Sequence, residues 1–331
     1  MSSATKHLAL LFFSLASFCL AQQTPRKEPC TPAPILVSVV DLHGRPQDSL
    51  DTSNFEVKVD RKIVELQSAT YKVQPSRMVV VLDTSGSMSG SPSRHEKWEI
   101  TRAAVQEALS VPAPAVPIAL IAFSNGVYKT FPFNQSRSTM LSWLDGIDPK
   151  QRSGLHGKTA LRDAIAAANR LLDPHQEGDA IYAITDGGEN ESTTTNKELE
   201  SQLLRNHVRL YTFLLRERIS VDLEEGQTFV DMVTNTGGAL FGETASDSYW
   251  WENQPQYSFD EKIKNRIAGQ AAMLVARTAA FYRIDLLHPE APKEGSNLSV
   301  DVVGRNGKKR ADLLVAYPKK FFACSSSPTS P

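Results

Sequence analysis

The middle of the chain alternates near-continuous apolar runs with stretches of helical period. The apolar runs are RMVVVLD, VPIALIAFS, DAIYAITDG and VRLYTFLL. Strands that are apolar on both faces are buried on both faces, as in a parallel sheet covered by helices. The stretches between the runs predict helices at about 96–110, 136–147, 196–207, 221–236 and 262–280, and a further one beginning near Thr159. We therefore expect an α/β domain with a doubly wound, mostly parallel sheet over residues 76–280.

The two regions that flank this domain have a different pattern, in which apolar and polar residues alternate. This period of two is typical of half-buried antiparallel strands, and it covers residues 34–75 and 281–321. Turn signals stand at His43-Gly44, Asp60-Arg61 and Asn306-Gly307. We expect the two flanks to form one small β-rich module, a sheet or a sandwich, interrupted by the domain between them.

The amino end reads as a secretory signal peptide over residues 1–21. A short polar start with Lys6 precedes the apolar stretch LALLFFSLASFCLA, which ends in the small residue Ala21. The stretch is too short to span a bilayer comfortably, and polar residues of a linker at 22–33 follow it. Cys19 suggests a lipoprotein, but Phe18 stands where a lipobox has Gly or Ala. We expect cleavage after Ala21 and a secreted or periplasmic chain without a membrane span.

Charge and cysteine content narrow the function further. The 331 residues contain 36 basic and 37 acidic side chains, for a net charge of −1. No strong electrostatic field is available to hold nucleic acid or an anionic membrane, so a partner must be recognised at a local site.

Without the signal peptide, two of the three cysteines remain, Cys30 and Cys324. A disulfide between them and two separate thiols are both open, and residues 322–331 are expected to form a disordered tail.

Oxygen-bearing side chains follow two of the buried strands. The first strand ends in Asp83, and Ser85 and Ser87 lie in the loop after it, whereas the run DAIYAITDG leads into Asp186. In a doubly wound sheet of order 3-2-1-4-5-6, the first and fourth strands are neighbours at the point where such folds bind ligands. Asp83 and Asp186 should therefore converge. Thr159, in GKTAL, lies on a loop expected to open over the same edge.

Two carboxylates and three hydroxyls suit a hard cation such as Mg²⁺, which prefers oxygen ligands. If the hydroxyls bind directly and the aspartates act through water, the cation keeps an open position for a carboxylate of a partner. Each part alone has an ordinary explanation: Asp-x-Ser-x-Ser is common in turns, Thr159 fits a helix N-cap, and Asp186 fits a turn. The order of all three parts after buried strands favours a metal site.

The stretches DTSGSM, GKTAL and ITDGGEN resemble the three parts of the metal-ion-dependent adhesion site of von Willebrand factor A (VWA) domains. The resemblance implies metal ligation by Asp83, Ser85, Ser87, Thr159 and Asp186, with Mg²⁺ as the first choice and Mn²⁺ or Ca²⁺ as alternatives. The flanks more loosely resemble the extracytoplasmic VWA-related proteins abundant in Acidobacteria. The implied function is adhesion or assembly through a protein partner that presents an Asp or Glu carboxylate.

Three enzyme classes with related patterns fail on spacing. A haloacid dehalogenase needs a second carboxylate two residues after Asp83, where Ser85 stands. A P-loop ending at Thr159 needs glycine at Arg152, and a serine hydrolase motif at 86–90 has Met88 in the nucleophile position. We therefore expect no catalysis. Two alternatives stay open: a hydrolase that uses the same cation to activate water, and a structural envelope protein with a vestigial metal site.

Overall fold

The computed structural model describes residues 33–74, 76–89, 96–110, 116–149, 155–216, 223–244, 259–287 and 295–321. The predicted signal peptide, nearly all of the linker, both mature cysteines and the tail lie outside the described residues. The same holds for residues 90–95 and 150–154. Across the described part of the chain, no helix is both long and apolar enough to cross a membrane.

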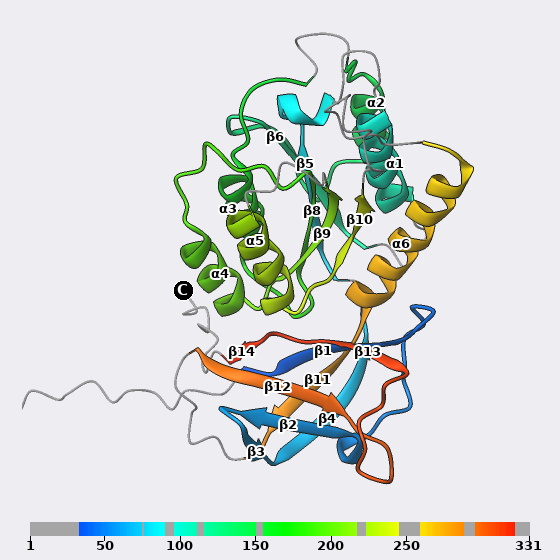
Figure 1. The fold of residues 1–331 in the computed structure, drawn as a ribbon, viewed down its shortest axis with the longest axis vertical. Coiled ribbons are helices and arrows are strands. Elements are labelled where there is room, and N and C mark those ends of the chain that lie inside the picture. The colour runs from blue at the N-terminus through cyan, green and yellow to red at the C-terminus, as the bar shows by residue number, and fades with distance from the viewer. Residues whose placement is uncertain are drawn as a thin grey trace, which may run out of the picture. The chain divides into compact units, whose positions relative to one another are not determined.

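A six-stranded sheet forms the centre of the middle region, in the order β10-β9-β8-β5-β6-β7 (Figure 1). The strands are β5 (Met78–Asp83), β6 (Ile118–Phe123), β7 (Val127–Phe131), β8 (Ala180–Thr185), β9 (Arg209–Arg216) and β10 (Leu240–Thr244). Neighbours are parallel except for β7, which runs antiparallel to β6. Counted from β5, this is the doubly wound order 3-2-1-4-5-6, so the predicted fold class is confirmed.

Helices cover both faces of this sheet. One face carries α1 (Glu96–Ser110), α2 (Arg137–Asp145) and α6 (Glu261–Ala279), and the other carries α3 (Leu161–Leu171), α4 (Asn196–Arg205) and α5 (Leu223–Asn235). Alternate residues of β5 enter the two cores: Val80 and Leu82 pack with the first set, Val79 and Val81 with the second. All residues of β5, β6 and β8 are buried, which explains their continuous apolar sequence.

The flanks form two antiparallel four-stranded sheets packed face to face. One has the order β13-β1-β11-β4 and the other β14-β12-β2-β3. Their strands are β1 (Ile35–Asp41), β2 (Phe55–Val59), β3 (Lys62–Val64), β4 (Leu66–Val73), β11 (Ala280–Leu286), β12 (Ser296–Val302), β13 (Leu313–Ala316) and β14 (Lys320–Phe321). Val37, Val57, Ile284 and Val300 meet in the core between the sheets. Both sheets mix strands from the two ends of the chain, as the sequence pattern predicts.

Two strands of the central sheet are not evident from the sequence. In β7 only Phe131 is buried, and β10 contains Gly242 with a φ of +134°. A Cβ at Gly242 would lie 2.0 Å from the carbonyl oxygen of Leu214, so the close approach of β10 to β9 requires glycine there. Both are edge strands with a single neighbour, and such strands carry a weaker apolar pattern than central ones.

Candidate functional site

Asp83 is the last residue of β5, and its side chain is completely buried. The N–H of Ser85 donates to its Oδ1 at 2.8 Å, and the hydroxyl of Thr185 donates to its Oδ2 at 2.7 Å. Thr185 ends β8, the parallel neighbour of β5. The carboxylate is therefore fixed between two strand ends at the carboxyl edge of the sheet.

The loop after β5 turns tightly as a short 3-10 helix, η2 (Gly86–Ser89). Met88 is fully buried in the core, and it anchors this turn. The hydroxyl oxygens of Ser85 and Ser87 lie 3.0 Å apart, and Ser85 is inaccessible to solvent. The turn thus brings the two predicted serine ligands together beside Asp83.

Thr159 reaches the site on a segment that is hydrogen bonded to the same turn. The N–H of His156 donates to the carbonyl of Thr84, and that of Gly86 donates to the carbonyl of Gly157, both at 3.1 Å. Thr159 is not a helix N-cap: α3 is preceded by Ala160, which makes no side-chain cap bond. The Thr159 hydroxyl donates to or accepts from no other described residue, although the side chain is buried. Its oxygen is therefore available to a ligand.

Asp186 follows β8 and lies against a buried lysine, which the sequence analysis did not identify. Lys97 of α1 donates from Nζ to Asp186 Oδ2 at 2.6 Å and to the Ser87 carbonyl at 2.9 Å. Only 2% of the Lys97 side chain and 9% of the Asp186 side chain are exposed. A Cβ at Gly188 would meet Asp186 Oδ1 at 3.2 Å and Thr159 Oγ1 at 3.6 Å, so both oxygens lie close to Gly188.

The electrostatics of the two carboxyl groups differ. Burial and repulsion from Asp186 raise the pKa of Asp83 to about 7. Burial also acts to raise the pKa of Asp186, but the adjacent Lys97 ammonium and a hydrogen bond from Ser87 outweigh it and hold that pKa below its usual value. Asp186 is therefore compensated by an internal cation, whereas Asp83 lacks a positive partner of its own.

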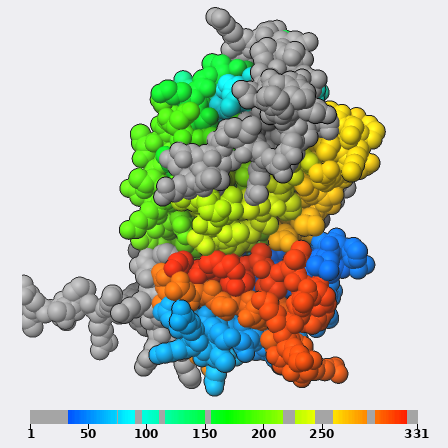
Figure 2. Space-filling view, in the orientation of Figure 1, coloured from blue at the N-terminus to red at the C-terminus, as the bar shows by residue number. Residues whose placement is uncertain are grey.

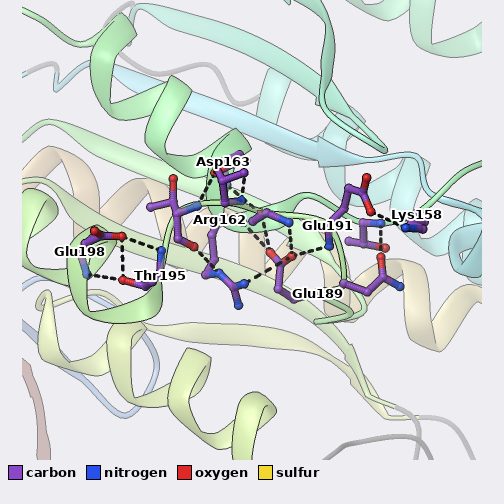
Figure 3. Close-up of polar contacts among 12 residues, drawn as sticks. Lys158, Arg162, Asp163, Glu189, Glu191, Thr195 and Glu198 are labelled. Atoms are coloured by element: carbon purple, nitrogen blue, oxygen red, sulfur yellow. Dashed lines mark hydrogen bonds and ion pairs between the residues drawn. The ribbon is translucent and has the colours of Figure 1, made fainter.

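The loop after Asp186 is bound to the first turn of α3 (Figure 3). Glu189 accepts from the backbone N–H of Arg162 at 2.9 Å and from the N–H and hydroxyl of Ser192 at 2.9 and 2.7 Å. Asp163 accepts from the backbone N–H groups of Thr193 and Thr194 at 3.0 and 2.9 Å. The carboxylate of Glu189 is thus engaged in holding the loop rather than in facing solvent.

Two further contacts in Figure 3 secure this loop at its surface and at its end. Lys158 forms an ion pair with Glu191 at 2.6 Å, which joins the segment of Thr159 to the loop. Thr195 and Glu198 form a capping box at the start of α4, where the loop ends. Both segments that reach toward Thr159 and Asp186 are therefore ordered by their own polar contacts.

The donor set at this edge consists of two carboxylates and three hydroxyls. In the described ranges, this site included, no group of three or more His, Cys, Asp or Glu side chains is arranged to hold a metal ion. Oxygen-only ligands of this kind fit Mg²⁺, Mn²⁺ or Ca²⁺ better than softer metals. Ser87 contacts both Ser85 and Asp186, and the N–H of Ser85 donates to Asp83. Thr159 and Asp186 both lie close to Gly188.

Lys97 could have been found from its position on a predicted helix. Buried residues of α1 include Lys97, Thr101, Ala104 and Ala108, which are spaced three or four apart. That spacing marks the face of the helix that packs on the sheet. A lysine on such a face needs a buried anionic partner, and Asp186 is that partner.

Comparison with known proteins agrees with this architecture. Residues 78–189 match the family model of the von Willebrand factor type A domain. This part of the chain is similar to a VWA domain. The matched range runs from the start of β5 to Glu189, and it includes every residue of the predicted site. A comparison with curated proteins gave no significant match.

Solved structures with similar folds share little sequence with the chain. An aerotolerance-related membrane protein from Bacteroides fragilis is 15% identical, with 61% of this chain and 98% of that one covered and a TM-score of 0.44. A von Willebrand factor type A protein from Catenulispora acidiphila is 11% identical, with coverages of 91% and 76% and a TM-score of 0.42. Proximal thread matrix protein 1 from the mussel byssus, with a zinc-occupied MIDAS motif, is 13% identical, with coverages of 67% and 50% and a TM-score of 0.46. At these sequence identities and TM-scores, the structural similarities support no conclusion about function.

Proposed function

We propose that the VWA domain binds a divalent cation, Mg²⁺ first, and through it the Asp or Glu carboxylate of a protein partner. The ligands are Asp83, Ser85, Ser87, Thr159 and Asp186. The observation that carries the proposal is the convergence of these oxygens, from three separate segments, at the switch point of a doubly wound sheet. The cation, when bound, supplies Lewis acidity and one open coordination position.

The charges around the site favour an anionic partner. Asp83 and Asp186 together carry two negative charges, and the Lys97 ammonium offsets one of them. A divalent cation therefore leaves the group with a net positive charge. Because the surroundings are buried, this charge is weakly screened, and a carboxylate arriving at the open position is attracted to it.

We further propose that the chain acts outside the cytoplasm, after cleavage of the amino-terminal signal, as an adhesion or assembly module rather than as an enzyme. Hydrolysis would require a general base beside the cation. Glu189, the acid nearest to Asp186 in sequence, is engaged by backbone N–H groups of the loop and of α3. Its geometry supports a structural role.

Mn²⁺ provides a direct test of both halves of this proposal. The relaxation rate of water protons rises when Mn²⁺ binds a protein and keeps an exchangeable water, so the purified protein should enhance relaxation saturably. A short peptide containing Asp should then lower the enhancement by displacing that water, and the same peptide with Asn should not. Equal effects of the two peptides, or no enhancement by the protein, would contradict the proposal.

A further inference from the structure

Arg277, near the end of α6, is a buried cation with no side-chain partner among the described residues. Only 7% of the residue is exposed, and its Nε has no hydrogen-bond acceptor. No described residue accepts a hydrogen bond from its guanidinium or forms an ion pair with it. Arginine cannot escape this cost by losing its proton, and buried polar groups are normally satisfied. The Nε–H of Arg277 is therefore open to an acceptor that the described residues do not supply.

Arg277 is among the residues that line a cavity of about 420 Å³. The cavity lies between the VWA domain and the sandwich, where β13 runs beside α5 and β10 (red and yellow-green in Figure 2). Its apolar lining includes Leu240, Val300, Leu313 and Val315. The volume is within the usual range of sites for small molecules.

The charged residues that line this cavity are all basic. They are Arg277, Lys309 and Lys319, and no acidic side chain is among the lining residues. Lys309 pairs with Asp301 at 2.5 Å, and the Lys319 ammonium lies 3.4 Å from the centre of the Tyr317 ring. The described lining residues thus bring three basic side chains to the cavity wall, and none of its lining residues is acidic.

Backbone contacts hold the walls of the cavity in place. The N–H of Lys319 donates to the carbonyl of Asn235 at 2.8 Å, which joins the last strands to the end of α5. Arg209 donates to the carbonyl of Arg277 at 2.8 Å and to those of Gly178 and Thr278. Because Arg209 is engaged by these carbonyls, the position of Arg277 is fixed while its own guanidinium stays unpaired. The cavity is thus a preformed site.

We propose that this cavity binds a small organic anion, with its carboxylate or phosphate on Arg277 and Lys319 and its apolar part against Leu240 and Val315. The planar guanidinium donates two parallel hydrogen bonds to either kind of headgroup. The apolar wall favours an anion that carries a hydrocarbon chain over inorganic phosphate. This inference is independent of the metal site, which lies at the opposite, carboxyl edge of the sheet.

The test is a titration of the full-length protein with hexanoate, hexyl phosphate, inorganic phosphate and the neutral analogue hexanamide. The readout is the ¹⁵Nε–H resonance of Arg277, assigned by its loss in the Arg277→Lys variant. Hexanoate or hexyl phosphate should shift it saturably, and the tighter of the two identifies the headgroup. Inorganic phosphate should bind more weakly, and hexanamide should leave the resonance in place.

Two lysine variants separate the cavity from a general charge effect. Lys319→Met should weaken binding by about tenfold or more, as expected for a lost charge-assisted hydrogen bond. The matched control is Lys320→Met, because Lys320 pairs with Asn297 and does not line this cavity. Absence of a saturable shift with any anion, an equal shift with hexanamide, or equal weakening in the two lysine variants would overturn the proposal.

Discussion

Replacing Lys97 with methionine removes the positive charge that forms an ion pair with Asp186. Both side chains are almost completely buried, and the bond between them is 2.6 Å long. Loss of one partner leaves an uncompensated carboxylate next to Asp83, and breaking a buried pair in this way costs about 3–5 kcal/mol. We expect Lys97→Met to lower the free energy of unfolding by that amount when the protein is free of metal.

Lys158→Met is a matched control for this change. Lys158 pairs with Glu191 at the same distance of 2.6 Å, but 64% and 36% of the two side chains are exposed. Exposed pairs contribute about 0–1 kcal/mol, so this variant should lose little stability. Urea denaturation in EDTA measures both variants under the same conditions.

Added Mg²⁺ extends the same experiment to the metal site. A bound cation replaces part of the lost positive charge, so Mg²⁺ should raise the stability of Lys97→Met by more than it raises that of the wild type. The double variant Lys97→Met, Asp186→Asn should recover part of the loss, because the unpaired charge is gone. A loss no larger than that of Lys158→Met, or no additional stabilisation by Mg²⁺, would refute the reasoning.

Two other changes test the fold around the site. Burial, and to a smaller degree His175, lower the pKa of His207 in the folded protein below its usual 6.5. The folded state therefore resists protonation of this side chain. The contribution of neutral His207 to the free energy of unfolding is complete above pH 6.5, and it is lost as the pH falls toward the lowered pKa of the folded state. His207→Asn, which tolerates the positive φ of 53°, should flatten this acid loss in urea titrations between about pH 7 and 5; an unchanged slope would contradict the assignment. Gly242→Ala should destabilise the protein by at least about 1–3 kcal/mol through strain at φ +134° and the clash with Leu214, and a melting temperature equal to that of the wild type would contradict it.

The sequence predicts the central sheet because β5, β6 and β8 are buried along their whole length and are therefore continuously apolar. It also predicts that Asp83 and Asp186 are close together, because Asp83 ends one of two neighbouring parallel strands and Asp186 follows the other. The helical spacing places Lys97 on a buried face, but it does not identify Asp186 as the partner, since the ion pair joins residues 89 positions apart. The surroundings of Arg277 are not evident for a similar reason, because residues of β13, distant in the sequence, line the same cavity. Pairwise long-range contacts of this kind leave no local pattern.

The central claim is best tested by calorimetric titration of Mg²⁺ and Mn²⁺ into the purified protein and two double variants. Asp83→Ala with Ser85→Ala removes two proposed ligands. Asp51→Ala with Ser53→Ala removes the same Asp-Thr-Ser pattern elsewhere, where the Ser53 N–H also donates to the aspartate at 2.8 Å. Saturable binding in the wild type and the second variant, lost in the first, is the result we predict. Absence of binding in the wild type, or equal binding in the first variant when circular dichroism shows it folded, would contradict the metal site.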